Sequence, residues 1–563
     1  MSHPRLVSGS RPRASGPVRA ATVITILAVA GLIGYPVARL IPSAHFGAAL
    51  SAPGVGLAAW HTVALAAVVT VVAVPVGAAM ALAVRRPDLP LRRTLSVAMV
   101  VPLVFPQFVL GYSWTQAYGK AGFTDTFLGL HWQGLLGPAG IAVVLIINAA
   151  PLCYLLTAAG LATRAQPDLE HAARVSGASP ATVLATVTLP LLRPALGAAA
   201  VLTFVATLES FAVPQMLGAP AGFSTITTRI YADLALGSDP ATFDEAVALA
   251  LGLVLLAAVL LIPADLILAP RLRSERTGQS SSAGGRAPRT ARSMFIAAGM
   301  WLYLALGVGL PTLALIAASI TRAIGLKPTP SNWTLDNFSA LATPASAQQL
   351  AHSLELAVAA AFILVVLGAI VALLARTVHG RALLGLTTLS LVVPGSTLAV
   401  GLLLAYGRWL DGTLTLILLA YLAKLWALAS RPISGAVDRL PPAEVHAART
   451  SGAGPLAALR TVVVPALAPA VAGAWLLVFL TALHEVTISS LLYSTHSETV
   501  AVALLNSQEL GDIGQTAALS VSLTALVLLA ALPMAALLRM AVRRRGIALP
   551  DVSELPREVS VAR

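Results

Sequence analysis

Three ionisable side chains lie in long apolar runs of this 563-residue chain. Glu209 occurs in TLESFAVP, and His484 and Glu485 occur in ALHEVTIS. A charged group in hydrocarbon is costly, so such residues by default indicate a functional polar pathway. The structural alternative is an interhelical hydrogen bond or a water-filled crevice. We expect these three side chains to line a translocation path at the interface between two halves of the molecule.

Two other polar side chains in apolar runs are expected to have structural roles. Lys424 lies seven positions before Arg431, and we expect its ammonium group to snorkel to the nearby membrane surface. Asn148 is expected to hydrogen-bond between helices.

A polar motif of ten residues occurs twice. HAARVSGASP begins at His171 and HAARTSGAGP begins at His446, so the offset between the copies is 275. Each copy predicts a short helix that ends at a left-handed glycine, Gly177 or Gly452, and a second helix that begins at a proline. A capped turn without function is the alternative. Near-identity at two distant places favours a function.

The elements that must position these residues are membrane helices. Hydrophobic residues make up 57% of the chain and charged residues 10%, with a mean hydropathy of +0.85. Soluble domains carry about 25% charged residues. The net charge of +13 is spread over short gaps between apolar runs, which is typical of membrane loops and not of a nucleic-acid groove. The single cysteine, Cys153, excludes a disulfide framework.

A helix needs about 20 apolar residues to cross a bilayer. The sequence predicts an all-α polytopic membrane protein with about twelve transmembrane helices. The predicted spans are 21–42, 58–84, 94–112, 139–162, 195–217, 245–269, 294–319, 352–376, 382–405, 412–430, 468–492 and 516–540.

The spans form two six-helix units of the same orientation, and we therefore expect two parallel repeats. The predicted segments are a basic N-terminus (1–20), a first repeat (21–270), a linker (271–293), a second repeat (294–541) and a tail (542–563). Arginines concentrate on one side, so the positive-inside rule places both termini, the linker and both motif copies in the cytoplasm of a multi-pass inner-membrane protein.

Similarity between the halves extends beyond the motif. His61-Thr62 resembles His352-Ser353 at an offset of 291, and Val101-Pro102 resembles Val393-Pro394 at an offset of 292. The offset then falls to 275 at the motif. We therefore expect the second half to be shorter, by the difference between these offsets, at the position of loop 113–138.

Both motif copies resemble the EAA loop of ABC-transporter permeases, in which E-A-A is followed by three residues, G, nine residues, I, one residue and L-P. Gly177 is followed at this spacing by Val187 and Leu189-Pro190, and Gly452 by Val462 and Val464-Pro465. The motif glutamate is replaced by His171 and His446, with Glu170 and Glu444 nearby.

The resemblance implies the type I ABC importer permease fold, as a fused two-repeat permease of the ferric-iron type. In that family the loops dock on a cytoplasmic ATPase. The coupling residues that the resemblance implies are Glu170, His171, Ala172, Ala173, Gly177, Pro190, Glu444, His446, Ala447, Ala448, Gly452 and Pro465.

The resemblance also implies the partners. They are two copies of an ABC ATPase subunit, an extracytoplasmic solute-binding protein and membrane lipids, with no nucleic acid. The sequence has no Walker-type phosphate loop. We therefore expect a permease without catalytic residues, metal or cofactor of its own, and ATP used by the partner subunits.

The stretch LGAPAGFSTITTRIY (217–231) resembles the ferric-iron branch of these permeases, so iron(III) is the expected cargo. Thiamine, polyamine and 2-aminoethylphosphonate are the alternatives. A proton-coupled secondary transporter also has twelve spans in two halves, but such a carrier needs no ATPase dock. An intramembrane enzyme would need a cluster such as H-E-x-x-H, which the sequence lacks.

Overall fold

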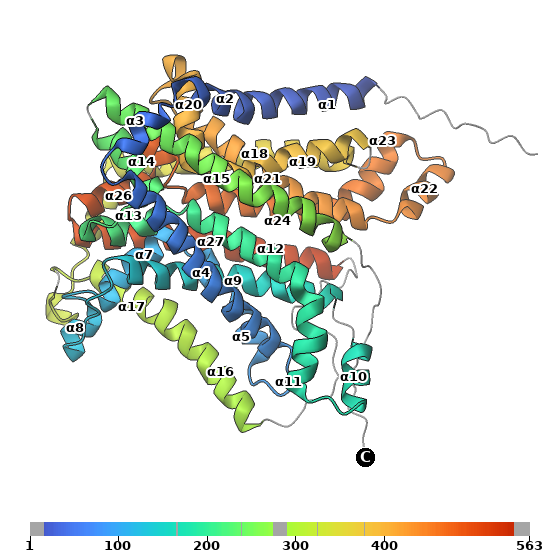
Figure 1. The fold of residues 1–563 in the computed structure, drawn as a ribbon, viewed down its shortest axis with the longest axis horizontal. Helices are drawn as coiled ribbons and strands as arrows, with labels where there is room; N and C mark the ends of the chain where they lie inside the picture. Colours follow the sequence, from blue (N-terminus) through green and yellow to red (C-terminus); the bar gives the residue numbers. More distant parts are fainter. Residues whose placement is uncertain are drawn as a thin grey trace, which may run out of the picture.

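A computed structural model describes residues 16–164, 167–237, 239–273, 290–323, 325–375 and 378–544, and these residues form helices without a β-strand. Residues 1–15 of the predicted basic N-terminus, 274–289 of the predicted linker and the tail beyond Arg544 lie outside the described residues. The arrangement is shown in Figure 1.

The first half contains nineteen helical segments, several of which are short or π-helical. They are α1 Gly16–Val29, η1 Ala30–Gly34, α2 Tyr35–Ser43, α3 Phe46–Ser51, α4 Val55–Val84, α5 Arg92–Ala98, α6 Val101–Val104, α7 Gln107–Tyr118, α8 Phe123–Leu128, α9 Pro138–Arg164, α10 Pro167–Val175, α11 Pro180–Val183, η2 Leu184–Thr188, α12 Leu189–Leu208, α13 Ala212–Gly218, η3 Ala219–Ala221, α14 Ile226–Tyr231, η4 Ala232–Leu236 and α15 Pro240–Arg273.

The second half repeats this order with different loops. Its segments are α16 Ala291–Leu304, η5 Ala305–Gly309, α17 Leu310–Ser319, η6 Pro330–Asn332, η7 Asp336–Ala342, α18 Pro344–Leu374, α19 Val378–Val392, α20 Gly395–Leu410, α21 Leu414–Arg439, α22 Pro442–Thr450, α23 Pro455–Ala458, η8 Leu459–Val463, α24 Val464–Leu483, α25 Ser489–Leu492, α26 Val500–Glu509 and α27 Ile513–Arg544.

Ten continuous helices among the described residues are long and apolar enough to cross a membrane, and two bent pairs bring the number to twelve. The twelve-span prediction is therefore confirmed when each bent pair counts as one span. The prediction of continuous helices at 94–112 and 382–405 is wrong. The helices bend by 99° between Arg92–Val104 and Gln107–Leu128, and by 103° between Leu383–Val392 and Gly395–Leu410.

Prolines explain both bends. Pro106 and Pro394 each have an extended backbone, with ψ of 132° and 150°, and immediately precede the second helix of their pair. Proline lacks an N–H group and disfavours a helical conformation in the residue before it. The apolar run therefore continues while the helix stops.

Two other predicted spans end earlier than expected. The helices that correspond to 195–217 and 468–492 are Pro180–Leu208 and Leu456–Leu483. They begin just after the motif and end immediately before Glu209 and His484, which occupy the C-cap positions. The prediction that these polar residues lie within a span is therefore wrong, because the chain leaves the helix where they occur.

The first helix of each half packs on the other half. Helices α1 and α2 lie against α18, α19 and α20, whereas α16 and α17 lie against α5 and α7 (Figure 1). Each of these first helices contains a π-helical turn, η1 and η5, and the two turns are related by the offset of the motif. The first helix of each half therefore contributes to the interface between the halves.

Aromatic side chains satisfy the carbonyls of the π-helical turns. A π-helical turn interrupts the i→i+4 bonding of the helix that contains it. The Tyr406 hydroxyl donates to the Gly31 carbonyl at 2.8 Å, and Trp114 Nε1–H donates to the Gly307 carbonyl at 2.9 Å. Both bonds cross between the halves, and Trp114 and Tyr406 are related by the same offset as Val101 and Val393.

The expected difference in loop length is present. Nineteen residues (119–137) separate α7 from α9, whereas three (411–413) separate α20 from α21. The predicted shortening of the second half is thus confirmed, and its size agrees with the fall in offset. An earlier loop is longer in the second half. Eleven residues (44–54) separate α2 from α4, whereas twenty-four (320–343) separate α17 from α18.

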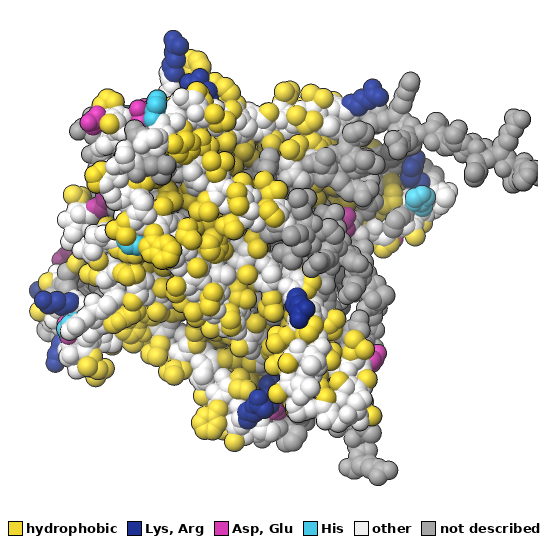
Figure 2. Space-filling view, viewed as in Figure 1, with side chains coloured by type: hydrophobic (Ala, Val, Ile, Leu, Met, Phe, Trp, Pro, Cys, Tyr) yellow, Lys and Arg dark blue, Asp and Glu magenta, His cyan; other side chains and the backbone are white. Residues whose placement is uncertain are grey.

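Apolar side chains form both the interior and much of the surface. The largest buried cluster contains residues of both halves. Figure 2 shows hydrophobic side chains over the middle of the molecule and most charged ones toward its two ends. Val71, Val259 and Leu529 belong to helices long and apolar enough to cross a membrane, and 69–70% of each residue is exposed. An exposed apolar surface of this extent is suited to lipid and not to water.

We predict that Tyr406→Phe lowers the free energy of unfolding by about 1 kcal/mol, because the Gly31 carbonyl loses its donor in surroundings without water. Thermal unfolding of the purified protein in detergent measures the effect. Tyr35→Phe is the matched control, since Tyr35 is 44% exposed on the neighbouring helix. Equal stability of Tyr406→Phe and the wild type would contradict this role for the hydroxyl.

Candidate functional site: the repeated loops and a buried polar cluster

The two motif copies fold as predicted. Helix α10 ends before Gly177, which has φ of +87°, and α22 ends before Gly452, with φ of +88°. The N–H groups of the following residues, Ala178 and Ala453, bond five residues back to Ala173 and Ala448, both at 3.0 Å. This is the Schellman arrangement, in which a left-handed residue, usually glycine, closes a helix.

The chain restarts as a helix shortly after the glycine. The Ser179 hydroxyl accepts a hydrogen bond from the Thr182 N–H at 3.2 Å, and Pro180 occupies the first turn. This confirms the prediction that a second helix begins at the proline of the first copy. The second copy restarts at Pro455 with glycine in place of the capping serine.

A π-helical turn connects each restart to the next long helix. It is η2 in the first copy and η8 in the second, again related by the offset of the motif. Pro190 and Pro465 follow each turn at the second position of α12 and α24. Because proline cannot donate to the carbonyl four residues earlier, it favours such an irregular turn.

Both copies present the same face to solvent. His171 and Ala172 are exposed and Ala173 is half-buried, and the corresponding residues His446, Ala447 and Ala448 have the same exposure. Both loops lie at one end of the helix bundle, on the right of Figure 1, with α10 and α22 at separate corners. We call this the motif end. Two similar surfaces are therefore available at this end.

The two nearby glutamates differ in position. Glu444 is exposed, whereas Glu170 is half-buried and accepts a hydrogen bond from the Thr188 hydroxyl at 2.9 Å. The first helix of the motif is thus attached to the π-helical turn that follows it.

A buried ion pair joins the two halves. The Lys424 ammonium group of α21 donates to the Glu209 carboxylate at the end of α12, and each side chain is 17% exposed. The prediction that Lys424 snorkels to the membrane surface is wrong. A counter-ion from the other half of the chain lies within reach, and pairing with it removes the need to reach water.

Lys424 also binds the bend of the broken helix. Its ammonium group donates to the Val393 carbonyl at 3.1 Å, directly before Pro394. In the first half, Asn148 Nδ2 donates to the Pro102 carbonyl at 3.3 Å and its Oδ1 accepts from Gln107 at 3.0 Å. Asn148 therefore connects helices as predicted. A carbonyl near each bend is thus bound by an amide in the first half and by an ammonium group in the second.

Glu485 is held by backbone N–H groups. Its carboxylate accepts from Ile488 N at 2.8 Å and from Ser489 N at 3.2 Å, at the start of α25. The Ser489 hydroxyl in turn hydrogen-bonds to the Tyr421 hydroxyl at 2.7 Å, one turn from Lys424 on α21. Glu209 and His484 occupy matched helix ends at the offset of the motif, and Glu485 follows directly.

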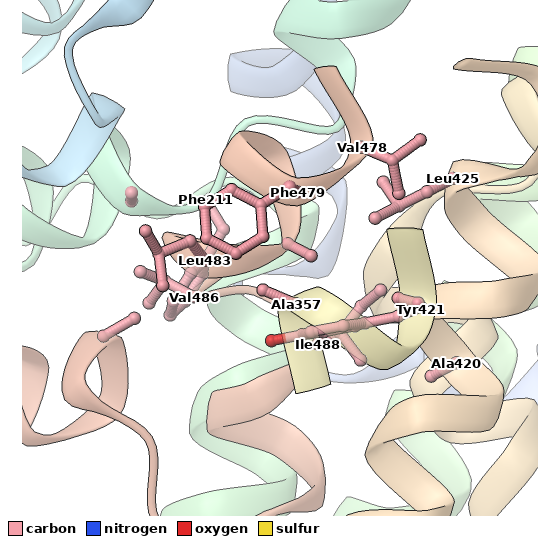
Figure 3. Close-up of a cluster of buried hydrophobic side chains, with 14 of the residues drawn as sticks. Phe211, Ala357, Ala420, Tyr421, Leu425, Val478, Phe479, Leu483, Val486 and Ile488 are labelled. Carbon is pink, nitrogen blue, oxygen red and sulfur yellow. The ribbon is translucent and has the colours of Figure 1, made fainter. Parts of the chain in front are cut away.

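Glu209, Lys424, Glu485, Ser489 and Tyr421 form what we call the polar cluster. Apolar side chains of both halves surround it. Figure 3 shows Phe211 of the first half beside Phe479, Leu483 and Val486 of the second. Tyr421 lies within the same group, with its hydroxyl toward the segment of Ile488. The surroundings exclude water from much of the interface, so charges there are strongly coupled.

Sequence reasoning missed two features of these sites. One is the ion pair of Lys424, because the sequence of its own helix does not indicate a counter-ion in the other half. The other is the repeated His-Thr and His-Ser pairs. His61 Nδ1 and His352 Nδ1 each bond to a carbonyl at 3.0 Å, from Ser224 and Glu498. The adjacent hydroxyls accept from the backbone N–H groups that begin α14 and α26. The recurrence of these pairs in both halves was the available signal.

Comparison with known proteins finds a match in each half of the chain. The family model described as the binding-protein-dependent transport system inner membrane component matches residues 73–274 and 364–547. The chain is 28% identical to a probable ABC transporter permease of Sinorhizobium fredii over 85% of its length and 86% of that protein.

Two other relatives differ in what they cover. The ferric transport system permease FbpB of Actinobacillus pleuropneumoniae is 26% identical over 74% of this chain and 61% of its own length. The molybdenum transport system permease ModB of Mycobacterium tuberculosis is 35% identical, but over 39% of this chain and 81% of its own length.

We predict that Lys424→Met lowers the free energy of unfolding by about 3–5 kcal/mol, because it leaves the Glu209 carboxylate unpaired in a buried site. Adding Glu209→Gln to this variant should recover most of the loss, since no charge then remains buried. Thermal unfolding of the four proteins in detergent gives the coupling between the two residues. Arg408→Met, at an exposed cation, is the control, and additive effects of the two core changes would contradict the ion pair.

Proposed function

The chain belongs to the family of binding-protein-dependent transport system inner membrane components, and on this premise we propose that it forms the iron(III) translocation path of an ATP-driven importer. Membership makes the chain a membrane component of a transport system and not a catalytic enzyme. It is the permease of an ABC importer, and such permeases work with an ABC ATPase and a solute-binding protein.

The pair of helix–glycine–helix loops carries the proposal of ATPase coupling. Each loop presents an exposed short helix at the motif end, and each continues through a π-helical turn into a long membrane helix. A push on α10 or α22 would thus reach α12 or α24, whose far ends carry Glu209 and His484. We propose that the motif end faces the cytoplasm and receives two ATPase subunits, one for each loop, with ATP bound by those subunits.

The fused architecture supports iron(III) as the cargo. Two ferric FbpB relatives match most of this chain. One from Actinobacillus pleuropneumoniae covers 74% of it, and one from Haemophilus influenzae is 25% identical over 79% of this chain and 82% of its own length. The molybdenum relatives cover at most 39% of this chain. Because their identity is higher there, molybdenum is the second candidate cargo.

The polar cluster supports a path at the interface of the halves. Glu209 and Lys424 come from different halves, and both lie in the buried region between them. Among the described residues, no three His, Cys, Asp or Glu side chains gather as metal ligands. A path that releases its cargo needs weak binding, so we propose that the binding protein supplies most of the selectivity.

We predict that Gly177→Val and Gly452→Val produce proteins that insert normally but retain the ATPase poorly and transport slowly. A β-branched residue at a φ this far into the left-handed region is strained by about 1–2 kcal/mol, so the preceding helix should change direction. Co-purification of the ATPase and uptake are the measurements. Gly454→Ala is the control, because this glycine of the same loop has no positive φ and open space around it. Unchanged co-purification and uptake in both valine variants would refute coupling through these loops.

The cargo is tested by uptake into vesicles that contain the chain with the ATPase and binding protein of the same genome. We expect ATP-dependent accumulation of radioactive iron(III) and none of molybdate. Glu209→Gln and Glu485→Gln should slow iron uptake severalfold while the ATPase still co-purifies, because each removes a charge from the proposed path. Accumulation of molybdate but not of iron would replace the cargo, and normal iron uptake by the double glutamine variant would leave both glutamates structural.

A further inference from the structure

Glu170 attaches the first motif helix to the membrane helices through polar contacts. Its Oε1 accepts the hydrogen bond from Thr188 and lies 3.6 Å from Arg85 Nη1 at the end of α4. The contacts are sheltered, because the side chains of Glu170 and Arg85 are 13% and 17% exposed and Thr188 is 6% exposed. One carboxylate therefore connects α10 with η2 and with α4.

The second copy uses different chemistry at the same places. The offset of the motif relates Glu170 to Val445 and Thr188 to Val463. Val463 is 9% exposed and belongs to the main hydrophobic cluster, and Val445 packs against that cluster. Neither valine side chain can form a hydrogen bond. A polar contact in one copy thus corresponds to an apolar contact in the other.

The remainder of the two loops is closely matched. The bend glycines have nearly the same φ, and the solvent-exposed His-Ala faces have equal exposure. Both short helices contact the π-helical turn that follows them. Each short helix therefore has to pack firmly on the π-helical turn that follows it. A polar contact achieves this in the first copy and an apolar contact in the second.

We propose that Glu170 is a positioning residue that sets the direction of α10 through Thr188 and Arg85, while Val445 and Val463 set the direction of α22 by apolar packing. The proposal rests on the proposed function in one respect, that α10 is a coupling helix. It also separates Glu170 from the solvent-exposed residues of the loop. The carboxylate faces the membrane helices, so it serves the ATPase contact indirectly.

The test exchanges the chemistry of one copy for that of the other. Glu170→Ala removes the polar contacts, and the double variant Glu170→Val with Thr188→Val introduces the apolar pair of the second copy. Glu170→Gln keeps an oxygen that can accept from Thr188 and loses the charge beside Arg85. Asp168→Ala is the matched control, because Asp168 is an exposed carboxylate of the same helix, α10.

Two measurements are made on each variant. A spin label on Val175→Cys reports the mobility of α10, since Val175 is 89% exposed and the native Cys153 is buried. The second measurement is the amount of cargo transported per ATP hydrolysed in the assembled importer. The label needs no ATPase, so it tests the attachment of α10 in the isolated protein.

We expect Glu170→Ala to mobilise the label and to lower transport per ATP by about tenfold, the effect of losing one charged hydrogen bond. The double valine variant should restore both measurements to near wild type, and Glu170→Gln should remain close to wild type in label mobility. Asp168→Ala should leave the mobility of the label unchanged.

Three results would overturn the proposal. The first is an unchanged label in Glu170→Ala. The second is a double valine variant as impaired as Glu170→Ala, which would show that the carboxylate itself is required at the ATPase. The third result is for the case in which the double variant does not accumulate. It is a spin label that is as mobile in Glu170→Gln as in Glu170→Ala. A wild-type chain that never stimulates an ATPase would refute the proposed function instead, and the label result would still stand.

Discussion

A backbone carbonyl that loses its helical partner inside an apolar environment must find another donor, because no water is present to replace it. This chain interrupts its helices repeatedly, with π-helical turns in the first helix of each half and sharp bends at prolines. The freed carbonyl of Gly31 receives the Tyr406 hydroxyl, and that of Gly307 receives the indole of Trp114. The donors come from the opposite half, so the interruptions hold the halves together.

The same constraint accounts for the charge at the centre of the interface. The bends in the two halves are held by Asn148 and by Lys424. An amide can do this as a neutral group, but an ammonium group brings a charge that needs a counter-ion. Glu209 supplies it from the other half. The halves also differ at the matched helix ends, where Glu209 of the first half corresponds to His484 of the second. These differences together place one ion pair across the interface.

The motif loops show how a duplicated chain keeps a geometry while its contacts diverge. Gly177 and Gly452 have nearly the same left-handed backbone, which few residues other than glycine adopt without strain. The seats of the preceding helices differ, with a carboxylate at Glu170 and an apolar side chain at Val445. The bend depends on a left-handed backbone, so both copies keep glycine there. The attachment of the short helix requires only a close contact with the following turn, which a polar or an apolar side chain can make.

The sequence by itself determined the number of spans, the repeat, the loop shortening and the helix–glycine–helix form of the motif. The spans and the form of the motif are local properties, set by the length of an apolar run and by the conformations open to glycine and proline. The repeat and the loop shortening follow from comparing the two halves of the sequence with each other. The tertiary structure alone decided that Lys424 pairs with Glu209 and that Glu170 faces inward to Thr188. Such choices depend on which groups a neighbouring element brings within a few ångströms. A pattern along one helix carries no information about a counter-ion 215 residues away.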